Sequence, residues 1–222
     1  MKTLLKIVTL LMPWFLRRRM LNQFFGFEIH PTAHIGFSWI YPKKLKMGPG
    51  SKIDLFNVAI HLDHIEMEDG AFIGRNNWIT GFESGTGSKH FNHQPNRVSR
   101  LFMGQQSSVT KHHHIDCTNS IEIGRFATVA GYGTQLLTHS IDVYENRQDS
   151  KPIIIGNYAF IGTSSVILGG AVIPDFCLLS AKSLLNKAFT ERWKIYGGVP
   201  AKLLCEIPKD AGYFSRESGF VY

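Results

Sequence analysis

The chain has 222 residues, 44% of them hydrophobic and 18% charged, which is the composition of one globular domain with a full hydrophobic core. Its three cysteines, Cys117, Cys177 and Cys205, are odd in number and far apart, which argues against a disulfide framework or a zinc site and indicates a reducing, cytoplasmic compartment. The net charge of +7 favours an anionic ligand or surface, but basic residues are not interleaved with stacking aromatics, so nucleic acid is not an expected partner.

Residues 4–16 are almost all apolar, and three arginines, Arg17 to Arg19, follow them. The run is shorter than the roughly 20 residues that a bilayer-spanning helix needs. It also lacks the cleavage site and the order of charge of a signal peptide. Two compatible interpretations stay open for residues 1–30: a helical cap on one end of the domain, or an interfacial helix whose arginines rest on the inner leaflet of a membrane.

Between residues 153 and 187 an aliphatic residue recurs at every sixth position. These positions are Ile155, Ile161, Ile167, Ile173, Leu179 and Leu185, and a small residue stands two positions before most of them. Neither an α-helix nor an ordinary strand has this period. A triangular coil does, because each six-residue segment makes one short strand and one corner, and stacked coils pair as parallel strands about 4.8 Å apart. The repeat therefore predicts an all-β parallel β-helix.

The same signature recurs upstream, where Met47, Met67, Met103 and Ile123 each begin a matching segment and Ile35 opens the array. The offsets between these segments mark two insertions, at residues 81–100 and 138–151. Insertions in a solenoid project outward and commonly carry function. We therefore expect a β-helix domain over residues 31–190 with two protruding loops, followed by a C-terminal tail over residues 191–222.

These features together resemble the hexapeptide-repeat O-acetyltransferases, above all the maltose and galactoside acetyltransferases and those of colanic acid and capsule biosynthesis. The resemblance covers roughly residues 30–204, and it is carried by THSIDVYENRQDSK at 138–151, KPIIIGNYAFIG at 151–162, the six-residue repeat and GGVPAK at 197–202. It implies left-handed coils, which the repeat alone does not, since such coils break the usual crossover rule. It also implies a homotrimer with active sites between neighbouring subunits, acetyl-CoA as the donor, and a role in polysaccharide biosynthesis.

The resemblance implies that the loop histidine, His139, is the general base that takes a proton from an acceptor hydroxyl as the hydroxyl attacks the thioester. An imidazole with a pKa near neutrality suits that task. Without the resemblance, a solvated loop histidine is the simpler interpretation. Asp142 and Glu145 are loop carboxylates that could orient the imidazole by accepting from its second nitrogen, although a loop carboxylate is more often simply solvated.

By motif position, seven residues are expected to contact CoA: Gly162, Thr163, Ser164, Ala181, Asn186, Lys187 and Lys202. The turn that contains Thr163 would lie at the thiol end and supply N–H groups to the oxyanion, and Ala181 would lie along the pantetheine arm. The two lysines would approach the phosphates, although solubility alone also explains them. Asn186 departs from the threonine of the family, so an amide would replace that hydroxyl contact.

Four residues are expected to contact the acceptor: His112, His114, Asn119 and Asp142. Asp116 is a weaker candidate. His113 stands where the repeat calls for a small residue, which predicts either a distorted strand or a locally wide prism. The basic loop at 81–100 either closes over the cleft of a neighbouring subunit or is an ordinary surface loop.

Three alternatives to O-acetylation stay open. A γ-type carbonic anhydrase shares the coil, but its His-x4-His spacing is absent, so no metal is expected. A non-catalytic β-helix trimer and an N-acetyltransferase acting on an amino sugar are the others. The short segment before the repeat leaves no room for a nucleotide-sugar domain, and its apolar character fits a polymeric or lipid-linked glycan precursor. We expect a cytoplasmic location, and a peripheral position at the inner membrane surface follows only from the second interpretation of residues 1–30.

Overall fold

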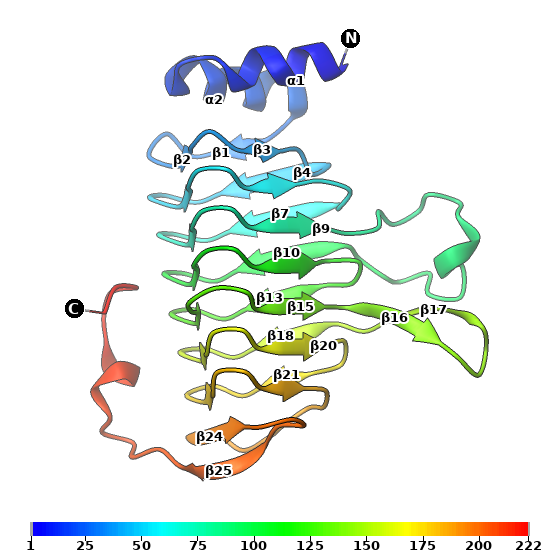
Figure 1. Cartoon of the computed structure of the whole chain (residues 1–222). Helices are drawn as coiled ribbons and strands as arrows, with labels where there is room; N and C mark the ends of the chain where they lie inside the picture. Colours follow the sequence, from blue (N-terminus) through cyan, green and yellow to red (C-terminus); the bar gives the residue numbers. More distant parts are fainter. Residues whose placement is uncertain (1, 222) are drawn as a thin grey trace.

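The molecule is a three-sided prism with two helices lying across one end (Figure 1). This computed structural model describes residues 2–221; residues 1 and 222, the outer ends of the predicted cap and tail, lie outside the described residues. The chain descends from the helices, its front strands run left to right, and it returns behind them, which makes the coil left-handed. The predicted fold class, a left-handed parallel β-helix with a short helical segment before it, is confirmed.

Three sheets form the walls, and each takes one strand from every coil. Sheet A contains β1 (Glu28–Ile29), β4 (Lys44–Met47), β7 (His64–Met67), β10 (Arg100–Met103), β13 (Ile121–Ile123), β18 (Ile153–Ile155) and β21 (Val172–Ile173). Sheet B contains β2 (His34–Ile35), β5 (Lys52–Ile53), β8 (Phe72–Ile73), β11 (Ser108–Val109), β14 (Thr128–Val129), β19 (Phe160–Ile161), β22 (Leu178–Leu179), β24 (Lys194–Gly197) and β25 (Lys202–Glu206). Sheet C contains β3 (Trp39–Ile40), β6 (Val58–Ala59), β9 (Trp78–Thr80), β12 (His114–Asp116), β15 (Gln135–Leu137), β20 (Val166–Leu168) and β23 (Leu184–Leu185).

Every strand of the coils buries at least one apolar residue in the prism, as the six-residue period predicts. The array opens with Ile29 in β1, one wall earlier than the expected Ile35. Stacking also requires glycine where coils approach closely: a Cβ on Gly124 would lie 2.6 Å from the backbone nitrogen of Asn157 in the next coil.

The three corners are built differently, which the sequence pattern did not predict. The residue two positions before the buried residue of each strand also points inward, at the corner that precedes the strand. In sheet A this residue is mostly large and aliphatic, in sheet B it is small, and in sheet C it is polar in every coil. The polar column consists of Ser38, Asn57, Asn77, His113, Thr134, Ser165 and Ser183. Its side chains bond the backbone of neighbouring coils, so that buried polar groups are paired; Asn57 Nδ2, for example, donates to the carbonyl of Gly74 at 2.6 Å.

His113 therefore fits without the distortion or the widening that we expected. Its side chain is 2% exposed, its Nδ1 accepts from the N–H of Thr134 at 3.1 Å, and β12 pairs in register on both sides. Burial lowers the pKa of His113 to about 4, so this imidazole is neutral at physiological pH.

Helices α1 (Lys2–Leu10) and α2 (Trp14–Phe25) close the upper end of the prism. Arg17 is 4% exposed, and its guanidinium donates to the carbonyls of Gly36 and Ser38 at 2.7 Å each. These carbonyls belong to the first coil, which has no coil above it. The expected patch of three arginines on a membrane is therefore wrong for Arg17, which caps the β-helix. Within residues 2–221 no helix is long and apolar enough to cross a bilayer.

The segment after the last coil is more ordered than a tail. Strands β24 and β25 form an antiparallel hairpin that extends sheet B. Beyond it the chain climbs back along the prism to the short helix η2 (Gly212–Ser215), seen in orange and red in Figure 1. There Phe214 packs edge-on against Phe176 and Trp193, two members of a stack of aromatic rings at one corner.

Candidate active site

Both insertions leave the prism at the same corner, between sheet C and sheet A. Residues 81–99 connect β9 to β10 and include the short helix η1 (Lys89–Phe91), and the hairpin of β16 (His139–Asp142) and β17 (Arg147–Ser150) connects β15 to β18. They project side by side (Figure 1). Gln94 joins them, because its amide nitrogen donates to the Asp149 carboxylate at 2.8 Å and its amide oxygen accepts from the Ser150 hydroxyl at 2.5 Å. We call residues 81–99 and 139–150 together the lobe.

His139 is the first residue of the hairpin, directly after a rigid anchor. The preceding residue, Thr138, is buried, and its hydroxyl donates to the carbonyl of Asp116 at 2.8 Å and accepts from the N–H of Asn119 at 2.9 Å. On the other side of the hairpin base, the N–H of Lys151 donates to the Thr138 carbonyl at 2.9 Å. The base of the hairpin is thus fixed to the coil, and the position of the histidine backbone is fixed with it.

The Asp116 carboxylate orients the imidazole. Its Oδ2 accepts from His139 Nδ1 at 2.5 Å, and its Oδ1 accepts from the N–H and the hydroxyl of Thr118 at 3.0 and 2.7 Å. Asp116 is 5% exposed, whereas the His139 side chain is nearly half exposed. Because a carboxylate only accepts, the proton of neutral His139 lies on Nδ1 and Nε2 carries the lone pair. Among residues 2–221, Nε2 has no hydrogen-bond partner.

The hydrogen bond between Asp116 and His139 also shifts the pKa values of both groups. The hydrogen bond to Asp116 raises the pKa of His139 above its ordinary value, and partial burial opposes this only in part. For Asp116, burial alone would raise the carboxyl pKa, but the hydrogen bonds from His139 and Thr118 outweigh it and lower that pKa. The result is an ionised, buried carboxylate behind a solvent-facing imidazole, which is the arrangement of an oriented general base.

Asp142 and Glu145 do not orient His139, contrary to expectation. Asp142 instead accepts from the N–H groups of Tyr144 and Glu145 at the tip of the hairpin, at 3.0 and 3.2 Å. The carboxylate that does bond His139 is Asp116, which the sequence indicates only as a weaker acceptor contact. Asp116 pairs across sheet C with Leu137, two residues before His139, and this register places the two side chains together. The coils around the insertion have irregular lengths, so the register cannot be read from the sequence spacing.

The residues predicted to bind CoA fall at the two corners that border sheet C. Gly162, Thr163, Ser164 and Ala181 stack at the corner between sheets B and C, where the backbone N–H groups of Thr163 and Ala181 bond no described residue. The Thr163 hydroxyl is already paired with the backbone of Tyr132, donating at 2.8 Å and accepting at 3.1 Å.

The other predicted CoA contacts lie near the opposite corner and beyond the last coil. Asn186 and Lys187 follow β23 at the corner from which the lobe projects, and Lys202 begins β25. All three are exposed. Neither lysine forms an ion pair within residues 2–221.

The predicted acceptor contacts do not form one cluster. His114 lies exposed on the outer face of sheet C, between Trp78 and Gln135 on the neighbouring strands. His112 lies at the far corner, beside Asn76. Asn119 supports the base of the lobe instead, because its side-chain nitrogen donates to the Ser150 hydroxyl at 3.1 Å.

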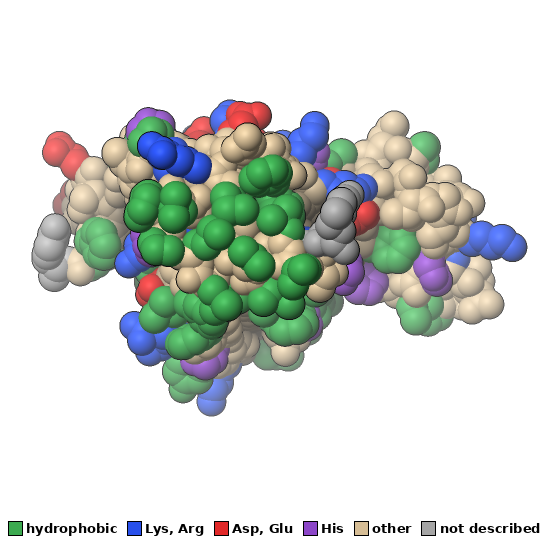
Figure 2. Space-filling view, turned by 90° about the horizontal axis from the view of Figure 1, so that it is seen from above, with side chains coloured by type: hydrophobic (Ala, Val, Ile, Leu, Met, Phe, Trp, Pro, Cys, Tyr) green, Lys and Arg blue, Asp and Glu red, His purple; other side chains and the backbone are tan. Residues whose placement is uncertain are grey.

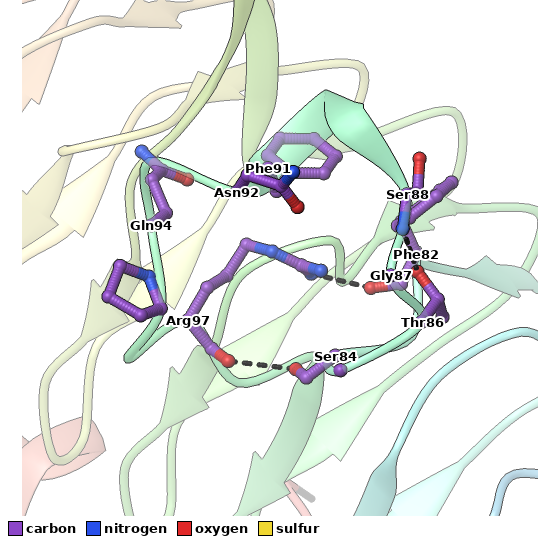
Figure 3. Close-up of a pocket in the computed structure, with 11 residues that line it drawn as sticks. Phe82, Ser84, Thr86, Gly87, Ser88, Phe91, Asn92, Gln94 and Arg97 are labelled. Atoms are coloured by element: carbon purple, nitrogen blue, oxygen red, sulfur yellow. Dashed lines mark hydrogen bonds between the residues drawn. The ribbon is translucent and has the colours of Figure 1, made fainter.

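The lobe contains two hollows. One, of about 290 Å³, lies within residues 82–97 and is shown in Figure 3. Arg97 crosses it, buried, and donates to the carbonyls of Phe82, Glu83 and Thr118, so this arginine holds the loop together. The other, of about 260 Å³, lies between η1 and the hairpin and is lined by Lys89, His90, Ile141, Asn146, Arg147 and Gln148. Within residues 2–221 no group of three or more His, Cys, Asp or Glu side chains is arranged to hold a metal ion.

No protein-family model and no curated protein matches this sequence. Solved structures do. The polysialic acid O-acetyltransferase OatWY has a TM-score of 0.58 at 18% identity, over 86% of this chain and 90% of that one. A mutant of the N-acyltransferase AntD from Bacillus cereus, in complex with dTDP and Coenzyme A, has a TM-score of 0.52 at 15% identity, over 86% of this chain and 89% of that one. The chain thus has the left-handed β-helix fold found in acyltransferases of both kinds.

Proposed function

We propose that this protein is a CoA-dependent acyltransferase that moves an acetyl group from acetyl-CoA to a hydroxyl of a sugar or glycan precursor, with His139 as general base. The observation that carries the proposal is the pairing of His139 Nδ1 with the buried Asp116 carboxylate, which leaves Nε2 of the half-exposed imidazole without a partner among residues 2–221. The fold shared with two acyltransferases supports the reaction class.

In the proposed reaction the acceptor oxygen attacks the thioester carbonyl while its proton passes to His139 Nε2. The Asp116 carboxylate stabilises the imidazolium that forms. The tetrahedral oxyanion collapses by breaking the carbon–sulfur bond, and the proton passes from His139 to the CoA thiolate as it leaves. The two unbonded N–H groups of Thr163 and Ala181 are our candidates for binding the pantetheine arm or the oxyanion.

The proposed CoA site runs along sheet C towards the exposed Lys187 and Lys202, whose charges suit the phosphates. For the acceptor we propose His114 on sheet C and the hollow of the lobe that Lys89, His90 and Arg147 line. The charges of Lys89 and Arg147 favour an anionic glycan. OatWY, one of the structural neighbours, acts on polysialic acid.

A homotrimer is part of the proposal. The lobe projects away from the prism and His139 begins its hairpin, so a neighbouring prism packed against the lobe would enclose the imidazole. Sedimentation equilibrium of the full chain tests this, and a monomer that turns over acetyl-CoA at full rate would contradict it.

The function is tested by an acceptor screen with acetyl-CoA in which release of the free thiol is measured. We expect turnover with sugar hydroxyls, and a fall of about a hundredfold to ten-thousandfold in kcat for His139→Ala. The control is His30→Ala, an exposed histidine on the first coil that should leave kcat unchanged.

Other outcomes of the same screen identify the rival functions. Transfer only to amino sugars assigns N-acylation. CoA binding without thiol release from any acceptor would point to a non-catalytic trimer. Full activity in His139→Ala removes the proposed base.

A further inference from the structure

Helix α1 turns its apolar face away from the rest of the molecule. Leu4, Ile7, Val8 and Leu11 follow the i, i+3, i+4, i+7 spacing of one helix face and are all exposed, Leu4 by 67% and Leu11 by 74%. The side chain that the helix buries is the polar Thr9, whose hydroxyl lies 2.9 Å from that of Tyr41. A helix that packs only against its own protein buries its apolar face and exposes its polar residues. The opposite arrangement in α1 indicates that its apolar face contacts a partner outside the chain.

The apolar face continues onto α2 through Phe15 and Leu16, which are also exposed. Figure 2 looks down on this end of the molecule and shows hydrophobic side chains gathered across it in one patch. We call Leu4, Ile7, Val8, Leu11, Phe15 and Leu16 the end patch. Contiguous apolar patches of this kind on a soluble surface mark sites of protein or membrane interaction.

Charge decides what the end patch meets. Residues 1–27 contain five basic residues, Lys2, Lys6, Arg17, Arg18 and Arg19, and no acidic residue. Three of them contact the prism: Arg17 caps the first coil, Lys6 Nζ lies 4.8 Å from the ring centroid of Tyr41, and Arg18 donates to the carbonyl of Ile29 at 3.4 Å. Arg19 is exposed on α2, one helical turn after Phe15 of the end patch. Two copies meeting end to end would bring like charges together, whereas an anionic lipid surface attracts each such cation by about 1 kcal/mol.

We propose that the end patch binds the surface of an anionic bilayer, with α1 and α2 lying in the plane of the headgroups and the axis of the β-helix standing along the membrane normal. Helices with an apolar face and a basic remainder enter the boundary between headgroups and acyl chains in this way. The exposed Arg19 can extend its guanidinium to the phosphates while the aliphatic and aromatic side chains go deeper.

The test is sedimentation of the full chain with phosphatidylcholine vesicles, with and without phosphatidylglycerol. We expect binding that needs the anionic lipid, that weakens as salt is raised, and that falls at least tenfold in Ile7→Glu/Leu11→Glu. The matched control is Leu203→Glu/Leu204→Glu, which adds the same charge to exposed residues of β25 at the opposite end of the prism. Melting curves of both variants show that they fold.

Three results would overturn the proposal. These are the absence of binding to both kinds of vesicle, equal binding to neutral and anionic vesicles, and equal loss of binding in both double variants. Sedimentation equilibrium is run in parallel without lipid. A doubling of mass that Ile7→Glu/Leu11→Glu abolishes would assign the end patch to a second copy of the chain instead. None of these measurements uses turnover, so they stand apart from the proposed reaction.

Discussion

Asp116 and His139 act as a pair, in which the buried carboxylate orients an imidazole that faces solvent. The carboxylate is held by two hydrogen bonds from Thr118, and its second oxygen fixes the tautomer and the direction of the imidazole. A loop histidine without this partner would rotate and titrate near its ordinary pKa of 6.5. The single contact therefore changes both the geometry and the charge of the proposed base.

Replacing this carboxylate should change the pH profile of acyl transfer. His139 acts as a base only when neutral, so kcat/KM should rise with pH through its raised pKa. In Asp116→Asn the anionic partner is lost, the pKa of His139 falls, and the acidic limb of the profile should move to lower pH while kcat drops. Asp142→Asn is the control, since Asp142 bonds only the tip of the hairpin. An unmoved limb in Asp116→Asn would show that His139 is not the titrating base.

The same pair contributes to stability within a defined pH window. Since the folded pKa of His139 is raised, its contribution is present below pH 6.5 and is lost as the pH rises through that folded pKa. Since the folded pKa of Asp116 is lowered, its contribution is present above pH 3.8 and is lost as the pH falls through the folded value. Both contributions are fully present between pH 3.8 and 6.5 and decline outside this window, towards the lowered carboxyl pKa on one side and the raised imidazole pKa on the other.

His113 should make the fold sensitive to acid. Its pKa is about 4 in the folded protein against 6.5 in an unfolded chain, so the unfolded state takes up a proton first. The free energy of unfolding should then fall by up to about 1.4 kcal/mol per pH unit between pH 6.5 and 4. His113→Asn copies the residue of the two coils above, Asn57 and Asn77, and should flatten this dependence in urea titrations.

At the scale of the elements, Arg17 of α2 supplies the hydrogen-bond donors that a further coil above the first would have supplied. The guanidinium of Arg17 bonds carbonyls that would otherwise face the end patch helices unpaired. Arg17→Met should therefore cost about 2–4 kcal/mol in the free energy of unfolding, because several buried acceptors lose their donor at once. Arg19→Met removes an equal charge from the same helix at an exposed position and should change stability by less than about 0.5 kcal/mol.

The hairpin base depends on a close approach between coils. A Cβ on Gly169 would lie 2.6 Å from the Thr138 carbonyl and 3.1 Å from that of Lys151, both of which bracket the hairpin that carries His139. Gly169→Ala should push this base outward, lower kcat and cost about 1–3 kcal/mol of stability. Gly212→Ala, where a Cβ meets nothing within 4 Å, is the control for assays of activity and thermal unfolding. Unchanged kcat in Gly169→Ala would mean that the hairpin tolerates displacement.

The sequence predicted the elements wherever a side chain faces the interior, because the six-residue period of residues such as Ile155 and Ile161 has one geometric cause. It located both insertions for the same reason. It could not predict that Gln94 joins them, because that contact is between two loops outside the repeat. It could not predict that Asp116 lies behind His139, because that contact depends on the register between coils. The polar column could not be predicted either, because serine and asparagine at a corner are also typical of exposed turns and only the structure shows that they are buried.

For the whole molecule, the stack is continuous from the helical end to the β24–β25 hairpin, and each coil touches only its neighbours. The lobe is the one large feature on its side, whereas the C-terminal segment covers part of another (Figure 1). The end patch and the proposed reaction site therefore occupy different surfaces, and a variant of one can be assayed without altering the other.

The regular spacing of the coils fixes the distance between the helical end of the molecule and His139. Four strand steps separate β3, next to the helices, from β15, just before His139. At about 4.8 Å per step, with a helix layer of about 10 Å above, the imidazole would stand roughly 30 Å from a lipid surface under the end patch. A glycan anchored in that same bilayer would then receive its acetyl group at units well beyond its anchor, and the sugars next to the lipid would be spared.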